Sequence, residues 1–473
     1  MQIDVLPDDI LLEVFDFYVY TDPYTWVTFE GKKKIESWQL LVHVCRRWRN
    51  IMFGSPRRLD LRLVCTPQTP TKDRLDVWPT FPLIIKSDVG SVSFSAMDNV
   101  IAALGQSNRV CQVSLSWLAG WQLEKVLALM QVSFPELKYV YLHSYDETLP
   151  LIPNSFLGGS APCLQYLELE GTLFPELPKL LLSATHLVNL HLYRIPHSGY
   201  ISPKEMVTSL TVLPCLESLS LEFGSPQSRP DWETQSLSPP KRSILPALSY
   251  FRFKGVTDYL EELVACIGTP QLDQMDITFF NQIDFDFPRL AQFINITPTL
   301  WASDEAHVIL DDSVAKVVLR CPTSKNRLPV LWITISCKEP DWQLSSIEQV
   351  CNSSLPAFST VEDLYIKHEY SELIWKDDAI ENSLWLEVLL PFTAVKNLYL
   401  FKDFAPGIVA TLQELVGGRM TEVLPSLQNI FVTGLEESQS MQKNIGQFVA
   451  ARKLSDHPIA ISVWDGKSDT KWM

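Results

Sequence analysis

The chain has 473 residues, of which 46% are hydrophobic and 20% are charged, and its formal net charge is −16 at pH 7. This composition is typical of a globular protein with a large core, and it excludes a chain that is disordered throughout. Residues 1–58 contain eight acidic and eight basic residues, so the negative charge comes from the remainder. Because such a surface repels phosphate backbones, we expect no nucleic-acid partner.

The amino terminus and the hydropathy pattern predict a protein of the cytosol or nucleus. The sequence MQIDVLPDD lacks the basic start and apolar core of a signal peptide. No apolar run approaches the roughly 18 residues that a membrane-spanning helix needs, so we expect no membrane partner. The nine cysteines include no Cys-x-x-Cys pair, which argues against a zinc site or a disulfide framework. No cofactor is expected.

The first predicted helix spans residues 5–20, VLPDDILLEVFDFYVY. Pro7 suits a first helical turn, and Asp8 and Asp9 complement the positive end of the helix dipole. The spacing predicts one broad apolar stripe, made of Ile10, Leu11, Val14, Phe15 and Tyr18.

A second helix is predicted over about residues 37–53, with apolar residues Leu41, Val44, Trp48 and Ile51 spaced by three or four positions. Gly54 and Pro56 end it. Two helices of this length bury little against each other, so something else must cover their apolar faces. They either cap the domain that follows or bind a partner.

The residues of these helices match a family pattern. LPDDILLEVF followed by LLVHVCRRWRNI resembles an F-box, although the stretch between the two halves, residues 21–36, is longer than usual. The resemblance implies binding to a Skp-type adaptor and, through it, to a cullin ubiquitin ligase. The adaptor-binding residues that it implies are Leu6, Pro7, Ile10, Leu11, Val14, Phe15, Leu41, Val44, Cys45 and Trp48. Some of these must hold the two helices together, and the sequence does not sort them.

From about residue 110 a unit of the form L-x-x-L-x-L recurs, often opened by proline, as in PELKYVYL, PCLQYLEL and PCLESLSL. Its starts are Val110, Leu137, Leu164, Leu187, Leu216, Leu248 and Leu272. One short strand per unit cannot bury its own face, so we expect stacked units to form a parallel sheet. Helices such as those predicted over residues 258–268 and 407–416 would cover its outer side.

The expected fold class is therefore α/β. The repeats resemble a leucine-rich-repeat horseshoe, without the usual asparagine after each strand. We predict an F-box over residues 1–60, a degenerate leucine-rich-repeat-like solenoid over 61–455 and a C-terminal cap or tail over 456–473. Residues 225–245, rich in Ser and Pro, predict an exposed loop. Between residues 275 and 361 the repeat template is lost, but β-branched apolar runs there predict that the sheet continues.

Several features are similar to chemical sites, and each has a structural interpretation. Cys163 and Cys215 occupy the same place in two copies of the repeat, which predicts small residues of the core. His186 and His191 are expected to be solvated on a repeat strand and not to bind a metal. The chain contains no Gly-x-Ser-x-Gly and no His-Glu-x-x-His. We therefore expect no enzyme, no catalytic residue and no metal site.

One position of the repeat, between its last two apolar residues, points away from the core. In the clear copies it is occupied by Tyr141, Glu168, His191, Ser220, Arg252, Asp276, Tyr365, Tyr399 and Phe431. Its last three members are aromatic, and Phe401 lies two residues beyond Tyr399. Clustered aromatic residues predict a target-binding surface at Tyr365, Tyr399, Phe401 and Phe431. The alternative is that the C-terminal segment with Trp464 folds over them.

Together these patterns favour the substrate-recognition subunit of a Skp-cullin-F-box ubiquitin ligase, which links the adaptor to an unknown protein target. The alternative is an interaction scaffold of the leucine-rich-repeat type that enters no ligase.

Overall fold

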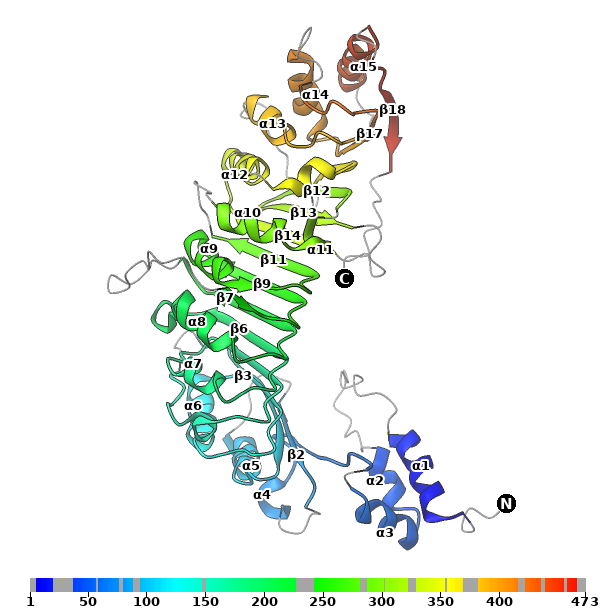
Figure 1. Cartoon of the computed structure of the whole chain (residues 1–473). Coiled ribbons are helices and arrows are strands. Elements are labelled where there is room, and N and C mark those ends of the chain that lie inside the picture. The colour runs from blue at the N-terminus through cyan, green and yellow to red at the C-terminus, as the bar shows by residue number, and fades with distance from the viewer. Residues whose placement is uncertain are drawn as a thin grey trace. The chain divides into compact units, whose positions relative to one another are not determined.

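The computed structural model describes residues 6–19, 37–56, 58–75, 80–87, 94–146, 150–226, 242–280, 287–301, 303–321, 329–353, 355–368, 382–415, 422–434, 439–454 and 457–465. It divides into two compact units, Met1–Leu164 and Gln165–Met473, here called unit 1 and unit 2. Both are mixed α/β (Figure 1). The boundary predicted after residue 60 lies inside unit 1.

Unit 1 combines helices with a short parallel sheet. Its helices are α1 (Asp8–Val19), α2 (Ser37–Val42), α3 (Arg46–Gly54), α4 (Thr71–Arg74), α5 (Phe94–Leu104) and α6 (Gly120–Leu129), with a 3₁₀ turn η2 (Phe156–Gly159). Its strands are β1 (Leu63–Cys65), β2 (Leu83–Ser87), β3 (Val110–Leu118) and β4 (Tyr139–Ser144). They pair in chain order, and every pair is parallel.

The second predicted helix, over residues 37–53, is wrong as a single helix because the chain breaks between α2 and α3. Cys45 is extended, with φ −157° and ψ 170°, and acts as the N-cap of α3. Its Sγ accepts a hydrogen bond from the backbone N–H of Trp48 at 3.4 Å. A cap of this kind satisfies a donor that a helix start leaves open, so a new helix begins where the apolar spacing had suggested continuity.

Unit 2 contains most of the repeats. Its helices are α7 (Leu177–Leu181), α8 (Pro203–Leu210), α9 (Thr257–Cys266), α10 (Pro288–Asn295), α11 (Pro298–Trp301), α12 (Pro340–Asn352), α13 (Asn382–Leu389), α14 (Ala405–Glu414) and α15 (Gln439–Leu454), with 3₁₀ turns η3 (His197–Gly199) and η4 (Pro356–Thr360). Its strands are β5 (Tyr166–Glu170), β6 (Asn189–Ile195), β7 (Ser218–Phe223), β8 (Ser243–Ile244), β9 (Tyr250–Gly255), β10 (Ile267–Gly268), β11 (Gln274–Phe279), β12 (Glu305–Asp311), β13 (Val314–Arg320), β14 (Pro329–Ser336), β15 (Asp363–Lys367), β16 (Asn397–Leu400), β17 (Asn429–Thr433) and β18 (Ala460–Trp464).

The long sheet of unit 2 follows the order β5-β6-β7-β9-β11-β14-β13-β12-β15-β16-β17-β18. All pairs are parallel except those of β13, which runs antiparallel to β12 and to β14. This three-stranded meander explains why the repeat template is lost between residues 275 and 361 although the sheet continues. Of the predicted loop 225–245, residues 227–241 lie outside the described residues.

The proline that opens many of the repeats belongs to a tight turn. In Ala161–Leu164 and in Leu213–Leu216 the last N–H donates to the first carbonyl, which closes a four-residue turn. Proline fits the second position of such a turn because its φ is already fixed. The leucine that ends the turn is buried and is the first core residue before the next strand.

These turns also correct one prediction. Cys163 and Cys215 occupy the third position of their turns and are exposed, so they do not fill the core. The two cysteines do occupy equivalent positions, but these positions are in turns. His186 is exposed as predicted, whereas His191 is half-buried.

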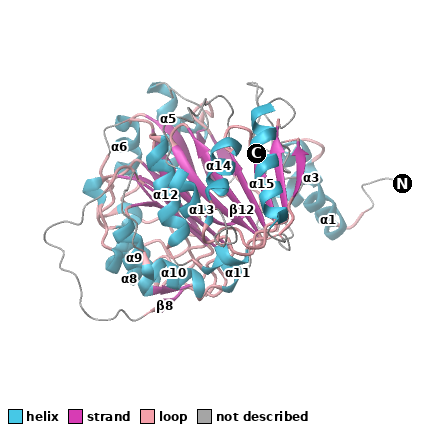
Figure 2. Ribbon diagram, turned by 90° about the horizontal axis from the view of Figure 1, so that it is seen from above, coloured by secondary structure: helices cyan, strands magenta, loops and turns pink. Residues whose placement is uncertain are grey.

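The helices cover the sheet and contact one another in sequence. Pairs α7 with α8, α8 with α9, α9 with α10, α12 with α13, α13 with α14 and α14 with α15 are neighbours. Figure 2 shows α12, α13 and α14 beside one another next to the strands. One helix start is capped by its neighbour: Glu261 of α9 accepts hydrogen bonds from the backbone N–H groups of Arg289 and Leu290, at 2.9 and 2.7 Å.

Candidate functional site

Helix α1 carries apolar side chains on two different faces. On one face Leu11 and Phe15 are fully buried, and the Phe15 ring lies 4.8 Å from that of Trp48 in α3. On the other face Ile10, Val14 and Phe17 are exposed by 48, 45 and 83%. These three lie at i, i+4 and i+7, so they form a single stripe along the helix. We call them the outer stripe.

The structure thus sorts the residues that the sequence left unsorted. Leu11, Phe15, Leu41 and Trp48 are buried inside the helical module, Leu6 and Cys45 are half-buried, and Pro7, Ile10, Val14 and Val44 are exposed. Val44, which belongs to the same predicted apolar stripe as Leu41 and Trp48, lies in the turn between α2 and α3 and is exposed. Three exposed residues, Phe17, Leu40 and Phe53, were missed by the sequence reasoning. The spacing of Phe17 from Ile10 was the available signal.

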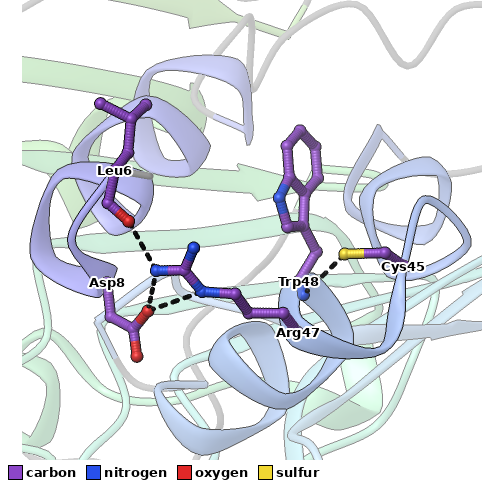
Figure 3. Close-up of polar contacts among 5 residues, drawn as sticks. All are labelled: Leu6, Asp8, Cys45, Arg47 and Trp48. Carbon is purple, nitrogen blue, oxygen red and sulfur yellow. Dashed lines mark hydrogen bonds and ion pairs between the residues drawn. The ribbon is translucent and has the colours of Figure 1, made fainter. Parts of the chain in front are cut away.

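Polar contacts fix the Leu-Pro segment that precedes α1. Arg47 of α3 donates from Nη2 to the Leu6 carbonyl oxygen at 2.5 Å and to Asp8 Oδ1 at 2.6 Å. Its Nε donates to the same carboxylate at 3.1 Å (Figure 3). An exposed ion pair of this kind contributes little stability, so its effect is to orient the start of α1 relative to α3. Arg58 forms a further ion pair with Glu13.

The module also packs onto the chain that follows it. The Phe81 ring, just before β2, lies 5.6 Å from that of Trp38 and 5.5 Å from that of Phe53. Trp38 is buried and has this intramolecular partner, whereas the residues of the outer stripe are exposed.

In unit 2 the residues at the outward position of successive repeats lie opposite one another on neighbouring strands and form a row across the sheet. Glu168 pairs with His191, His191 with Ser220, Ser220 with Arg252, and Arg252 with Asp276. Further along the sheet, His307, Tyr365, Tyr399 and Phe431 follow in the same way. His307 was missed in the sequence because its strand belongs to the meander, outside the repeat template.

The first part of this row is polar. Arg252 lies between two carboxylates, 2.9 Å from Asp276 and 3.5 Å from Glu222. Burial raises the pKa of both carboxyl groups, against the opposing charge of Arg252. His191 Nε2 lies 2.9 Å from the Ser218 hydroxyl. Arg252 is therefore already paired with carboxylates of its own surface.

The second part of the row is an aromatic stack. The ring centroids of His307 and Tyr365 are 4.6 Å apart, those of Tyr365 and Tyr399 4.2 Å, and those of Tyr399 and Phe431 4.6 Å, with planes within 10° of parallel. Burial raises the pKa of Tyr365 and of Tyr399. It lowers the pKa of His307 to about 4.

Trp464 of β18 packs against this stack. Its ring lies 5.8 Å from Tyr365, 5.5 Å from Tyr399 and 5.5 Å from Phe401, at angles of 60 to 82°. The four aromatic residues predicted to bind a target are half-buried. The structure brings them together, and it places the C-terminal strand over part of them.

The described part of the chain has neither a metal-binding cluster nor a membrane-spanning helix. No group of three or more His, Cys, Asp or Glu residues there is arranged to hold a metal ion. Nor does any described helix combine the length and apolarity needed to cross a membrane.

No protein-family model matches this sequence, and no curated protein matches it. Among solved structures, the chain is similar to the leucine-rich repeat-containing protein LegL7 from Legionella pneumophila, at 13% sequence identity and a TM-score of 0.27. The similarity covers 84% of this chain and 98% of LegL7. At that TM-score it carries no argument about function.

Proposed function

We propose that this chain is a non-enzymatic interaction scaffold, in which the N-terminal helical module binds one protein and the sheet of unit 2 binds another. The observation that carries this proposal is the outer stripe of α1. A short helix in a monomer needs one apolar face, and α1 already buries Leu11 and Phe15. A second apolar face on the same helix is an interaction surface by the usual standard of exposed hydrophobic residues.

The finer proposal concerns the partner. The resemblance of residues 6–51 to an F-box supports a Skp-type adaptor on the outer stripe, and with it a role as the substrate-recognition subunit of a cullin ubiquitin ligase. The chain would then act by raising the effective concentration of a target's lysines near the conjugating enzyme. No catalytic residue of its own is needed. A role in a ligase also fits a protein of the cytosol or nucleus.

The test is binding of a purified recombinant Skp-type adaptor to the full chain by calorimetry. Val14→Glu places a charge in the outer stripe and should weaken binding more than tenfold, since a central interface residue contributes more than about 1.4 kcal/mol. Val132→Glu is the matched control, because Val132 is also an exposed valine of unit 1, at 54%, outside the module. Equal binding by both variants contradicts the assignment of the outer stripe.

A second variant addresses the segment before α1. Replacing Leu6 and Pro7 together with alanine should abolish adaptor binding while the melting temperature stays unchanged. Copurification from cell extract then separates the finer alternatives. Adaptor with cullin supports the ligase subunit, adaptor alone supports a scaffold outside the ligase, and absence of both supports helices that merely cap the following domain.

A further inference from the structure

The last strand of the sheet buries one of its own side chains, Trp464. Strand β18 pairs only with β17 among the described strands, over five residues from Ala460 to Trp464. Of these five residues, Ala460, Ser462 and Val463 are exposed, Ile461 is half-buried and Trp464 is buried. A strand with three exposed side chains has little apolar burial to hold it, so Trp464, together with the buried Ile459 that directly precedes the strand, anchors it.

The Trp464 ring extends past β17, the strand with which β18 pairs. Trp464 is opposite Thr433 in the register, yet its ring reaches across β17 to Tyr399 and Phe401, and beyond them to Tyr365 on β15. All three contacts are edge-on or tilted, which is the favourable arrangement for an aromatic ring on the face of others. The surface formed by Tyr365, Tyr399 and Phe401, here called the indole seat, is therefore complementary to an indole carried on an extended strand.

We propose that the indole seat is a binding site for an extended segment of a partner protein that carries an aromatic side chain, and that Trp464 occupies the seat until such a segment replaces it. The partner segment would add to the edge of β17 in parallel, in the register that β18 now uses. Strand addition of this type takes its affinity from main-chain hydrogen bonds and its specificity from a side-chain pocket. The inference rests on the proposed scaffold function and names the chemistry of its second partner.

The way Trp464 occupies the indole seat indicates what a partner segment must present. An indole is seated among three rings at 5.5 to 5.8 Å, and its strand places it two residues after the position opposite Phe431. A partner must therefore present a bulky aromatic residue near the carboxyl end of a strand of about five residues. Because β18 is part of the same chain, its high effective concentration keeps the seat filled against weak competitors.

The segment from Ile459 to Asp465 supplies the probe. A fluorescein-labelled peptide of sequence IAISVWD is titrated against the full chain and its variants, and binding is followed by fluorescence anisotropy. Trp464→Ala should bind the peptide at least tenfold more tightly than the unchanged chain, because the competing anchor is lost. Val463→Ala, a change at an exposed position of the same strand, should behave like the unchanged chain. A peptide with alanine in place of its tryptophan should not bind Trp464→Ala.

Two results overturn the proposal. Equal binding by the unchanged chain and by Trp464→Ala shows that Trp464 does not block a site. Absence of binding by a folded Trp464→Ala shows that the seat accepts no strand in trans. If alanine lowers the melting temperature by many degrees, Trp464→Leu keeps an apolar anchor without the ring, and its failure to bind more tightly than the unchanged chain has the same meaning. The assay contains no adaptor, so its outcome is separate from that of the outer stripe.

Discussion

Glu261, a buried carboxylate on helix α9, should stabilise the stack of helices in unit 2. The residue is 9% exposed, and its two carboxylate oxygens accept from the first free N–H groups of α10. The N-cap residue of α10, Phe287, has no side-chain hydrogen bond to offer, so a glutamate from the neighbouring helix fills that role.

Replacement of Glu261 by alanine removes two charge-assisted hydrogen bonds and leaves two N–H groups unpaired. Loss of a cap costs roughly 0.5–2 kcal/mol, and a hydrogen bond to a charged group roughly 1.5–3 kcal/mol. We therefore expect a decrease of about 2–4 kcal/mol in the free energy of unfolding. Glu261→Gln keeps one acceptor and should lose about half as much.

The assay is urea unfolding followed by far-ultraviolet circular dichroism, with an unchanged slope required for the comparison. Asp258→Ala on the same helix is the control, because Asp258 is exposed and its favourable interaction with the helix dipole amounts to under about 1 kcal/mol. If Glu261→Ala costs no more than Asp258→Ala, the inter-helix cap does not stabilise the fold.

Two other perturbations test the interior of the sheet. The pKa of the His307 imidazole is about 4 in the folded protein and near 6.5 in the unfolded chain. Between these two pH values the unfolded state binds the extra proton. The free energy of unfolding should therefore fall by up to about 3 kcal/mol as the pH is lowered from 6.5 to 4. His307→Gln should lose this part of the pH dependence of the free energy of unfolding, measured by urea unfolding at pH 7, 5.5 and 4.5. The same pH dependence in the variant and in the unchanged chain would mean that the imidazole is not held neutral. Gly255→Ala would put a Cβ 2.5 Å from Phe253 Cζ and 2.9 Å from Phe223 Cδ2, which predicts a loss of about 1–3 kcal/mol by the same measurement. Gly268→Ala, whose Cβ meets nothing within 4 Å, should change stability by under about 0.5 kcal/mol, and equal effects at both glycines would contradict the packing argument.

The repeated features of the fold were accessible from the sequence. The period-two pattern of the repeats and their regular leucines predicted the strands, because each strand buries one face in the same way. The outward row was also predictable, since a parallel register aligns equivalent positions of successive copies. Local exceptions were not accessible. The break at Cys45 depends on a thiol cap, and the antiparallel course of β13 depends on a tight turn after Asp311.

The candidate surfaces were predictable only in part. Most apolar residues of α1 were identified, although Phe17 was not, but their division into Leu11 and Phe15 inside and Ile10 and Val14 outside depends on where Trp48 packs. The aromatic row was identified from one column of the repeat, whereas the contact of Trp464 with it crosses an intervening strand. Cys163 was wrongly predicted to lie in the core. Other copies of its turn carry glutamate, glutamine or serine at the same position, as in PELK, PQLD and PSLQ. Comparison of copies would have shown that this position is solvated.

The antiparallel meander has a consequence for the order in which this sheet can form. Neighbouring parallel strands of the repeats are joined by loops and helices, so each pairing must close a long segment before it gains contacts. Strands β12 and β13 are joined by Asp312 and Ser313 alone, so their pairing is local and can form early. Once β14 has joined, the meander offers one free edge to β11 and the other to β15, the two strands that flank it in the sheet. The meander can therefore act as a template to which the repeat strands on both sides add in turn, toward β5 on one side and toward β18 on the other.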